Sequence, residues 1–185
     1  MAAAIKKLRA LSIVRPQRRR EVRPPSAPKR VRNPQSGLAM DPQLTIYHDA
    51  SGGEFAAVIE EGCRVRLVIY QFDGSYLSIA AALTQAQRKL LGPGRLFDVK
   101  LEVETTRPLT VFLRLNIQAG EDGQTLYETI VVDSGERAVS FDLDGVRLAF
   151  HKIDSLWLDV IFSEPEMTEI TVREVDLKVT DRGKD

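Results

Sequence analysis

Hydrophobic and polar residues alternate with a period of two through most of the chain after about residue 43. Three long runs, at residues 95–105, 109–118 and 155–163, place aliphatic side chains on one face and mainly polar side chains on the other. This alternation is typical of β-strands with one buried and one solvated face. Shorter runs of the same kind predict further strands near residues 44–48, 65–72, 75–83, 126–132, 138–143 and 169–179.

Turn-forming residues separate these runs. Asp73-Gly74 lies between two β-rich segments and predicts a hairpin turn. Residues 120–123 and 133–135 supply two further turn signals of the same kind. In the last run the apolar positions change parity, which predicts a β-bulge near Arg173–Glu174.

One segment departs from the period of two. Residues 84–91 predict a short helix, which Gly92-Pro93-Gly94 would end. Closely spaced strands with a single helix leave no room for the crossovers of a parallel α/β sheet. We therefore predict an all-β fold, an antiparallel and jelly-roll-like β-sandwich of about 8–10 strands.

Charge divides the chain into two parts. Residues 1–40 contain eleven basic residues and one acidic residue, whereas residues 41–185 contain fifteen basic and twenty-five acidic residues. Six of the nine prolines occur by position 42. Each proline fixes φ and removes a backbone donor, so we expect neither a helix nor a strand ladder there. The predicted organisation is an extended, disordered basic arm at 1–42, a sandwich at 43–182 and a tail at 183–185.

The arm has three possible roles. It binds a polyanion such as nucleic acid or an anionic surface, it docks on an acidic protein surface of a partner or a second copy, or it is a solvated tail. The arm contains no aromatic residue, which disfavours single-stranded nucleic acid because bases stack on rings. Its basic residues are Lys6, Lys7, Arg9, Arg15, Arg18, Arg19, Arg20, Arg23, Lys29, Arg30 and Arg32.

Candidate catalytic residues are few. The chain lacks the phosphate-loop, dinucleotide, zinc-hydrolase and serine-nucleophile patterns, so we expect no cofactor and no enzymatic activity. Cys63 is either a structural cysteine or a thiol nucleophile, and a nucleophile would need one of the two histidines as its base. His48 and Asp49 are neighbours on a strand and point to opposite faces, so we expect no pair between them and interpret them as polar strand-end residues. His151 is interpreted as a polar loop residue.

Two carboxylate pairs are candidate calcium ligands. Asp142 and Asp144 end a predicted strand, and Glu121 and Asp122 lie in a turn. Neither pair belongs to a loop of regularly alternating oxygen ligands, so solvated surface charge is the alternative. We expect no metal site.

The outward faces of two strands carry a more suggestive set of side chains. Phe112, Arg114 and Asn116 alternate along one strand, and Trp157 and Asp159 along another. Adjacent strands would place an aromatic ring beside amide, guanidinium and carboxylate groups, a combination that suits the flat rings of a glycan. The alternative is that Trp157 and Phe112 pack beneath a loop, the helix or a second layer.

Three segments give the chain a family resemblance. YQFDGSYLSI at 70–79, FLRLNIQAGEDGQTLYE at 112–128 and LWLDVIFSEPEMTEITVREVDL at 156–177 resemble uncharacterised proteins from alphaproteobacteria of the Rhodobacter group. The resemblance covers residues 44–180 and carries no assigned catalytic residues. It implies a bacterial, non-secreted protein and a β-sandwich similar to carbohydrate-binding modules.

These observations favour a non-enzymatic interaction module whose basic arm docks on a protein partner. The plan of an arm attached to a sandwich is similar to attachment or spike-base subunits of phage-like particles, including gene transfer agents. Glycan binding by the outward face and polyanion binding by the arm are the alternatives. No apolar run is long enough for a membrane span, and no secretory signal is evident, so we expect a cytoplasmic protein.

Overall fold

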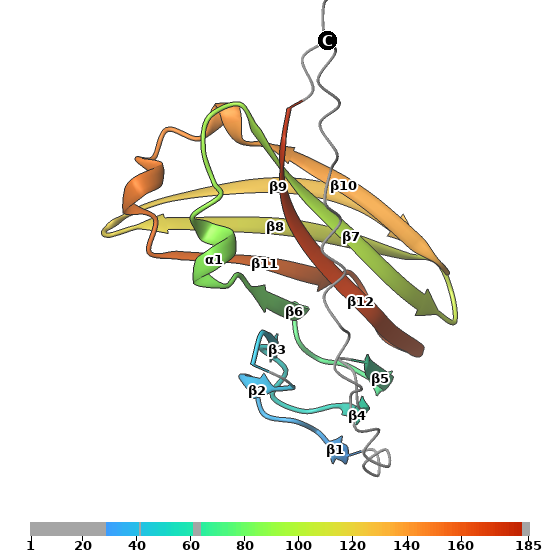
Figure 1. Ribbon diagram of the computed structural model, residues 1–185. Helices are drawn as coiled ribbons and strands as arrows, with labels where there is room; N and C mark the ends of the chain where they lie inside the picture. Colours follow the sequence, from blue (N-terminus) through green and yellow to red (C-terminus); the bar gives the residue numbers. More distant parts are fainter. Residues whose placement is uncertain (1–28, 41, 61–63, 183–185) are drawn as a thin grey trace, which may run out of the picture.

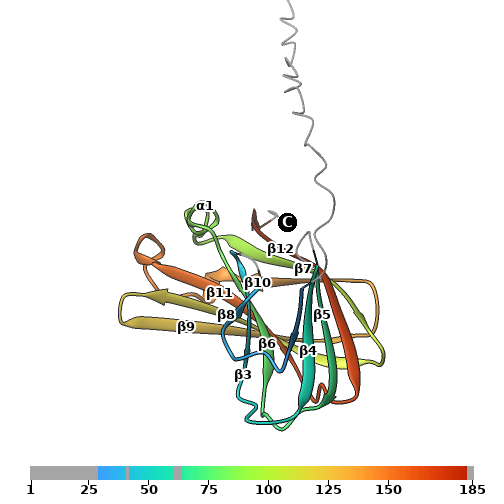
Figure 2. The ribbon, with the colours of Figure 1, turned by 90° about the horizontal axis from the view of Figure 1, so that it is seen from below.

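The protein forms two antiparallel β-sheets that pack face to face. The computed structural model describes residues 29–40, 42–60 and 64–182. Each sheet has six strands among these residues, and every strand pair is antiparallel. Seen from below, β3 and β6 lie on one side of the sandwich and β4 and β5 on the other (Figure 2). The predicted all-β sandwich is thus confirmed.

The two sheets, sheet A and sheet B, divide the strands as follows (Figure 1). Sheet A contains, in spatial order, β1 (Lys29–Arg32), β4 (Glu54–Glu60), β5 (Arg64–Gln71), β12 (Thr168–Asp181), β7 (Arg95–Thr105) and β10 (Glu136–Asp142). Sheet B contains, in spatial order, β2 (Leu38–Ala39), β3 (Leu44–His48), β6 (Leu77–Ala82), β11 (Ser155–Phe162), β8 (Leu109–Ala119) and β9 (Asp122–Val132). The helical segments are α1 (Gln85–Arg88), η1 (Leu143–Gly145) and η2 (Phe150–Lys152).

The core lies between the sheets and is built from alternate residues of each strand. Val99 and Leu101 of β7 and Leu113 and Leu115 of β8 are each no more than 1% exposed. Their burial removes apolar surface from water, the main favourable contribution to folding. The intervening residues of the same strands therefore face outward, which fixes the chemistry of the two outer faces.

Several strands match their predicted positions. β3 and β7 coincide with the predicted ranges, and β12 has the predicted bulge, between Val172 and Glu174. The predicted helix is present as α1, with Thr84 and Gln87 forming a reciprocal capping box. This helix lies beside β6 and β11 at one end of sheet B (Figure 1).

Two of the three predicted turns connect different sheets. Asp73-Gly74 follows β5 of sheet A and precedes β6 of sheet B, so the predicted hairpin is wrong. Residues 133–135 likewise connect β9 of sheet B to β10 of sheet A. Residues 120–123 do form the β8–β9 hairpin. Turn residues specify a reversal of the chain, and the two packed layers decide whether the next strand pairs with the previous one.

The segment expected to stay outside the sandwich contributes two strands. β1 pairs with β4, and β2 pairs with β3, so the prediction of no ladder before residue 42 is wrong for these strands. Pro34 lacks a donor but keeps its carbonyl oxygen, which accepts a hydrogen bond from His48 Nε2 at 2.8 Å. Gly37 donates its N–H to the carbonyl of Ile46 at 2.8 Å. These contacts fasten the segment because a proline blocks donation only at its own position.

β4 was also not predicted. Its sequence, EFAAVIE, has apolar residues at consecutive positions, so it lacks the alternation that marks a half-buried strand. Both faces carry small apolar residues with little exposed surface: Ala57 is fully buried in the core, and Ala56 on the outer face is 5% exposed between its neighbours. Within the described part of the chain no helix is long and apolar enough to cross a membrane.

Candidate functional site

A groove of about 650 Å³ crosses the outer face of sheet B. Its walls and floor come from β3, β6, β8 and β11, with Arg88 of α1 at the helical end. β6 supplies the floor, because its outward residues Ser78, Ala80 and Ala82 are small. Larger side chains stand on the neighbouring strands, Tyr47 on β3 and Trp157 on β11. The hollow therefore follows from side-chain size along one strand of a continuous sheet.

Asp159 is the buried polar centre of the groove. It lies on β11 opposite Arg114 of β8 and is 4% exposed. Its Oδ2 accepts hydrogen bonds from Arg114 Nε at 2.9 Å and from Asn116 Nδ2 at 2.9 Å, and it lies 2.8 Å from an Arg114 terminal nitrogen. A buried carboxyl group is costly unless it is paired, so these donors compensate its burial and hold it in place.

The other oxygen of this carboxylate remains available. No described residue donates a hydrogen bond to Asp159 Oδ1, although the side chain lines the groove. The indole N–H of Trp157, next but one along β11, likewise has no hydrogen-bond partner among the residues that the structure describes. The groove therefore presents one fixed acceptor and one donor beside an aromatic ring.

Aromatic residues border the groove on the side away from Trp157. Tyr47 is 42% exposed and Tyr76 is 37% exposed. Asp49 positions Tyr76, because its Oδ1 accepts the backbone N–H groups of Ser75 at 2.7 Å and of Tyr76 at 3.1 Å. The hydroxyl of Ser75 also donates to Asp49, and these bonds lower the pKa of the Asp49 carboxyl.

Gly74 allows this loop to close. A Cβ at residue 74 would lie 2.5 Å from Asp49 Oδ1 and 2.8 Å from the backbone nitrogen of Ala50. Any other residue would push Asp49 away from the hydrogen bonds that hold Tyr76. The Asp-Gly signal in the sequence thus serves a close approach at the groove rather than a hairpin.

Three of the five predicted glycan-face residues line the groove. β8 and β11 are hydrogen-bonded neighbours, which places Trp157, Asp159 and Arg114 together. Asn116 contributes through its bond to Asp159, while Phe112 is 41% exposed and does not line the groove.

Sequence reasoning missed the contribution of β3, β6 and the loop that precedes β6. Tyr47 and Tyr76 were not named, nor were the small residues of the floor. Period-two alternation within 44–48 already places Tyr47 on the outward side of its strand. The pairing of that strand with β6, and of β6 with β11, is visible only in the structure.

The two histidines have different surroundings. His48 is buried and contacts the rings of Phe55 and Phe72, with centroids 5.1 and 6.4 Å away, so its side chain belongs to the interior. Asp49 bonds Ser75 and Tyr76 rather than His48, as the strand geometry predicted. His151 is exposed in η2 and lines a hollow next to α1, separate from the groove on sheet B, that Arg88 also lines.

The candidate calcium carboxylates have protein partners. Asp142 and Asp144 lie 3.1 and 2.6 Å from the same Arg182 nitrogen, and Asp144 also accepts the N–H of Gly94 at 2.7 Å. These contacts fasten the last described residue to the end of β10. Glu121 and Asp122 belong to the β8–β9 hairpin. In the described ranges no three histidine, cysteine or acidic side chains cluster as metal ligands would.

Other predicted residues fall outside the described part of the chain. Cys63 is one of them. So are the eight basic residues that precede β1, namely Lys6, Lys7, Arg9, Arg15, Arg18, Arg19, Arg20 and Arg23. The remaining three, Lys29, Arg30 and Arg32, lie on β1.

Solved structures share this fold at low sequence identity. The enzymatically active domain of tailspike protein 4 from bacteriophage CBA120 is 9% identical with a TM-score of 0.52, and the match covers 78% of this chain and 20% of that chain. The xyloglucanase domain of NopAA, a type three effector from Sinorhizobium fredii, is 7% identical with a TM-score of 0.51, covering 82% and 99%. A family 4 carbohydrate-binding module is 11% identical with a TM-score of 0.45, covering 74% and 86%.

A carbohydrate-binding module is thus among the similar structures, at a TM-score of 0.45. A search of curated protein sequences finds no match. A family match extends over residues 8–184 and therefore includes most of the basic segment as well as the sandwich. This chain belongs to the Family of unknown function (DUF6478).

Proposed function

We propose that the protein is a non-catalytic module that binds a glycan in the outer groove of sheet B. The observation that carries the proposal is the held carboxylate of Asp159, with one oxygen free of described donors, beside Trp157 in a groove with a floor of small residues. A sugar ring has apolar C–H faces and a polar edge. The indole face suits the first, and a fixed carboxylate oxygen suits hydroxyl donors on the second.

The geometry favours binding over hydrolysis. Glycosidases generally need two carboxyl groups, one as acid and one as base or nucleophile. Asp159 is the single carboxylate among the described residues that line the groove. Its Oδ2 is fully engaged by Arg114 and Asn116, which suits an acceptor of fixed position and not a proton donor.

The shared fold supports the same class of ligand. The solved xyloglucanase domain of the Sinorhizobium fredii effector is in complex with cellobiose, so a related sandwich accommodates a β-linked glucose disaccharide. At 7% identity this likeness concerns the architecture alone. The site itself is argued from the residues of this chain.

Titration of the intrinsic tryptophan fluorescence tests the proposal. Trp157 is the only tryptophan of the chain, so the signal reports on the groove directly. We expect a saturable change in fluorescence with at least one member of a panel of β-glucans, xylans, mannans and polygalacturonate. Tyr47→Ala should weaken that binding by about tenfold, roughly 1.4 kcal/mol, because it removes one wall of the groove.

Tyr127→Ala is the matched control. Tyr127 lies on the same outer face, on β9, is 66% exposed and does not line the groove. Its removal should leave the affinity unchanged. Equal losses in the two tyrosine variants, or a flat fluorescence response across the whole panel, would rule out the groove as a glycan site.

Docking of the arm on a protein partner, the attachment role in a phage-like particle and the cytoplasmic location remain predictions from sequence. Of the three described basic residues on β1, Arg30 and Arg32 line a groove on the outer face of sheet A.

A further inference from the structure

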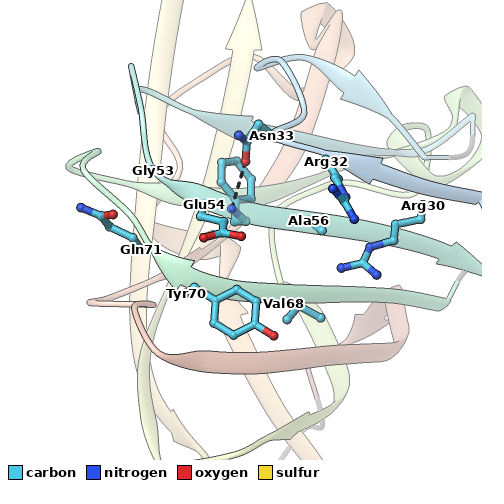
Figure 3. A pocket seen from close by; sticks show the side chains of 10 residues that line it. Arg30, Arg32, Asn33, Gly53, Glu54, Ala56, Val68, Tyr70 and Gln71 are labelled. Atoms are coloured by element: carbon cyan, nitrogen blue, oxygen red, sulfur yellow. Dashed lines mark hydrogen bonds between the residues drawn. The ribbon is translucent and has the colours of Figure 1, made fainter.

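A second groove, of about 660 Å³, lies at the β1 edge of sheet A, on the opposite face of the sandwich from the sheet B groove. It runs across β1, β4 and β5 (Figure 3). Figure 3 places the side chains of Arg30, Arg32, Glu54 and Tyr70 around Ala56. This edge groove is separate from the proposed glycan site in both position and composition.

Arg30 and Arg32 give the edge groove a positive wall. They alternate with Val31 along β1, and Val31 pairs with the buried Ala57, so both arginines point outward. Both are exposed, and neither guanidinium makes a hydrogen bond or ion pair with another described residue. The planar, permanently charged guanidinium groups are therefore available to bind phosphate in a bidentate way.

Tyr70 and Ala56 complete the edge groove. Ala56 lies between Arg32 and Val68 in the register of the three strands, and its small side chain leaves the floor open. Tyr70 follows on β5 with 56% of its surface exposed. An exposed ring in the same groove as arginines is an arrangement on which an unpaired base stacks. Glu54, which is also exposed, offers acceptors for the amino groups of a base.

A clamp at Asn33 holds the positive wall in register. Asn33 has a φ of 41° and ends β1. Its backbone N–H donates to the carbonyl of Phe55 at 2.8 Å, and its Oδ1 accepts the N–H of Phe55 at 3.1 Å. Asparagine tolerates this left-handed conformation better than most residues, so the clamp is encoded locally.

The sequence connects the edge groove to further positive charge. Residues 1–28 carry eight basic residues and one acidic residue, and they lead directly into β1. Basic N-terminal segments of this kind are common in nucleic-acid-binding proteins. The aromatic ring that the segment itself lacks is supplied by Tyr70 in the edge groove.

We propose that the edge groove binds single-stranded nucleic acid, with Arg30 and Arg32 on phosphates and a base stacked on Tyr70. Duplex nucleic acid hides its base faces and therefore leaves Tyr70 without a role. Polycarboxylates such as polygalacturonate or polyglutamate supply charge but no bases. The proposal is independent of glycan binding, since the two grooves share no residue.

Fluorescence anisotropy with the full-length chain tests this proposal, with a labelled oligothymidylate of about 20 nucleotides as the probe. Arg30→Gln/Arg32→Gln should reduce the slope of log affinity against log salt by about 1.4, since each phosphate contact on a single strand contributes about 0.7. Tyr70→Ala should weaken binding about tenfold and leave the slope unchanged, because stacking releases no counterions.

Arg147→Gln/Lys152→Gln is the charge-matched control, because both residues are exposed and distant in sequence from β1 and do not line the edge groove. It should bind as wild type. The proposal is wrong if this control and the groove double variant lose equal affinity, or if Tyr70→Ala binds as wild type. It is also wrong if duplex DNA or polyglutamate, at equal charge, binds as tightly as the oligothymidylate. Thermal unfolding monitored for every variant excludes loss of fold as the cause.

Discussion

The two outer faces of the sandwich use polar residues in opposite ways. On sheet B, Arg114 and Asn116 direct their donors at one buried carboxylate, Asp159. On sheet A, charged residues cover β7, β10 and β12 and pair at the surface, as in Lys100 with Glu136 at 2.8 Å. The hydrogen bond and charge of Glu136 raise the pKa of Lys100.

The difference lies in burial. Small residues on β6 leave a hollow between the larger side chains of the neighbouring strands, and Asp159, which is 4% exposed, lines it. The long side chains of sheet A stay in water, where an ion pair contributes little stability and restricts little motion. The proposed glycan site on sheet B is therefore held rigidly, while on sheet A the proposed recognition is confined to the β1 edge.

Filling each groove with a large side chain is the strongest test of whether the two faces bind different ligands. Ala80→Phe should block the sheet B groove and cost about 2 kcal/mol of glycan binding, on the order of thirtyfold in Kd. Ala56→Phe should do the same to oligonucleotide binding at the edge groove. Each variant should leave the other ligand unaffected in calorimetric titrations, and a loss of both ligands in either variant would contradict the separation of the two sites.

Removal of one arginine from each face should sharpen the contrast in stability. Arg114→Leu leaves the carboxylate of Asp159, 4% exposed, with Asn116 as its remaining donor. We expect a loss of about 2–3 kcal/mol in the free energy of unfolding, reduced from the cost of a fully buried pair because Arg114 is partly exposed.

Arg173→Leu is the comparison on sheet A. It removes a bidentate surface pair with Glu104, at 2.8 and 2.7 Å, and should cost about 0.2–1 kcal/mol. Urea denaturation of the two variants measures both values. Equal losses in the free energy of unfolding would show that burial gives the Asp159 network no more stabilising effect than a surface ion pair has.

Arg88 offers a way to define the glycan further. It lines the end of the sheet B groove, and its Nε is buried without a hydrogen-bond partner among the described residues. We expect an acidic group on the glycan to be bound there. Arg88→Gln should weaken binding of polygalacturonate fragments by about fivefold, roughly 1 kcal/mol, and leave neutral oligosaccharides unchanged. Equal effects on the acidic and the neutral oligosaccharides would show that Arg88 contributes only to packing.

The smallest expected effect concerns the loop that carries Tyr76. The Ser75 hydroxyl is the main cause of the lowered pKa of Asp49, so Ser75→Ala should raise this pKa toward its ordinary value of about 3.9. Because the pKa of Asp49 is lower in the folded than in the unfolded state, its carboxylate stabilises the loop at pH values above the unfolded-state pKa. This stabilisation is lost as the pH falls through the folded-state pKa. NMR titration of the carboxyl measures the change, with Asp73, which bonds Ser51 and Gly52, as an unchanged internal control.

Alternation along single strands predicted much of the fold and part of the site. It placed Trp157 and Asp159 on the outward side of one strand and Arg114 and Asn116 on the outward side of another, and the pairing of β11 with β8 brings them together. It did not identify β1, whose four residues include three cations. A strand this short and this charged is stabilised by the Asn33 clamp and by its ladder with β4, and the ladder has no local signal.

The sequence by itself determined which face of each long strand is apolar, because side chains alternate whatever the strand pairs with. Only the tertiary structure decided which strands become neighbours, since pairing depends on how two layers bury a common core. For that reason Asp73-Gly74 joins the sheets, and Ala80 and Ala56, unremarkable in the sequence, become the floors of the two grooves.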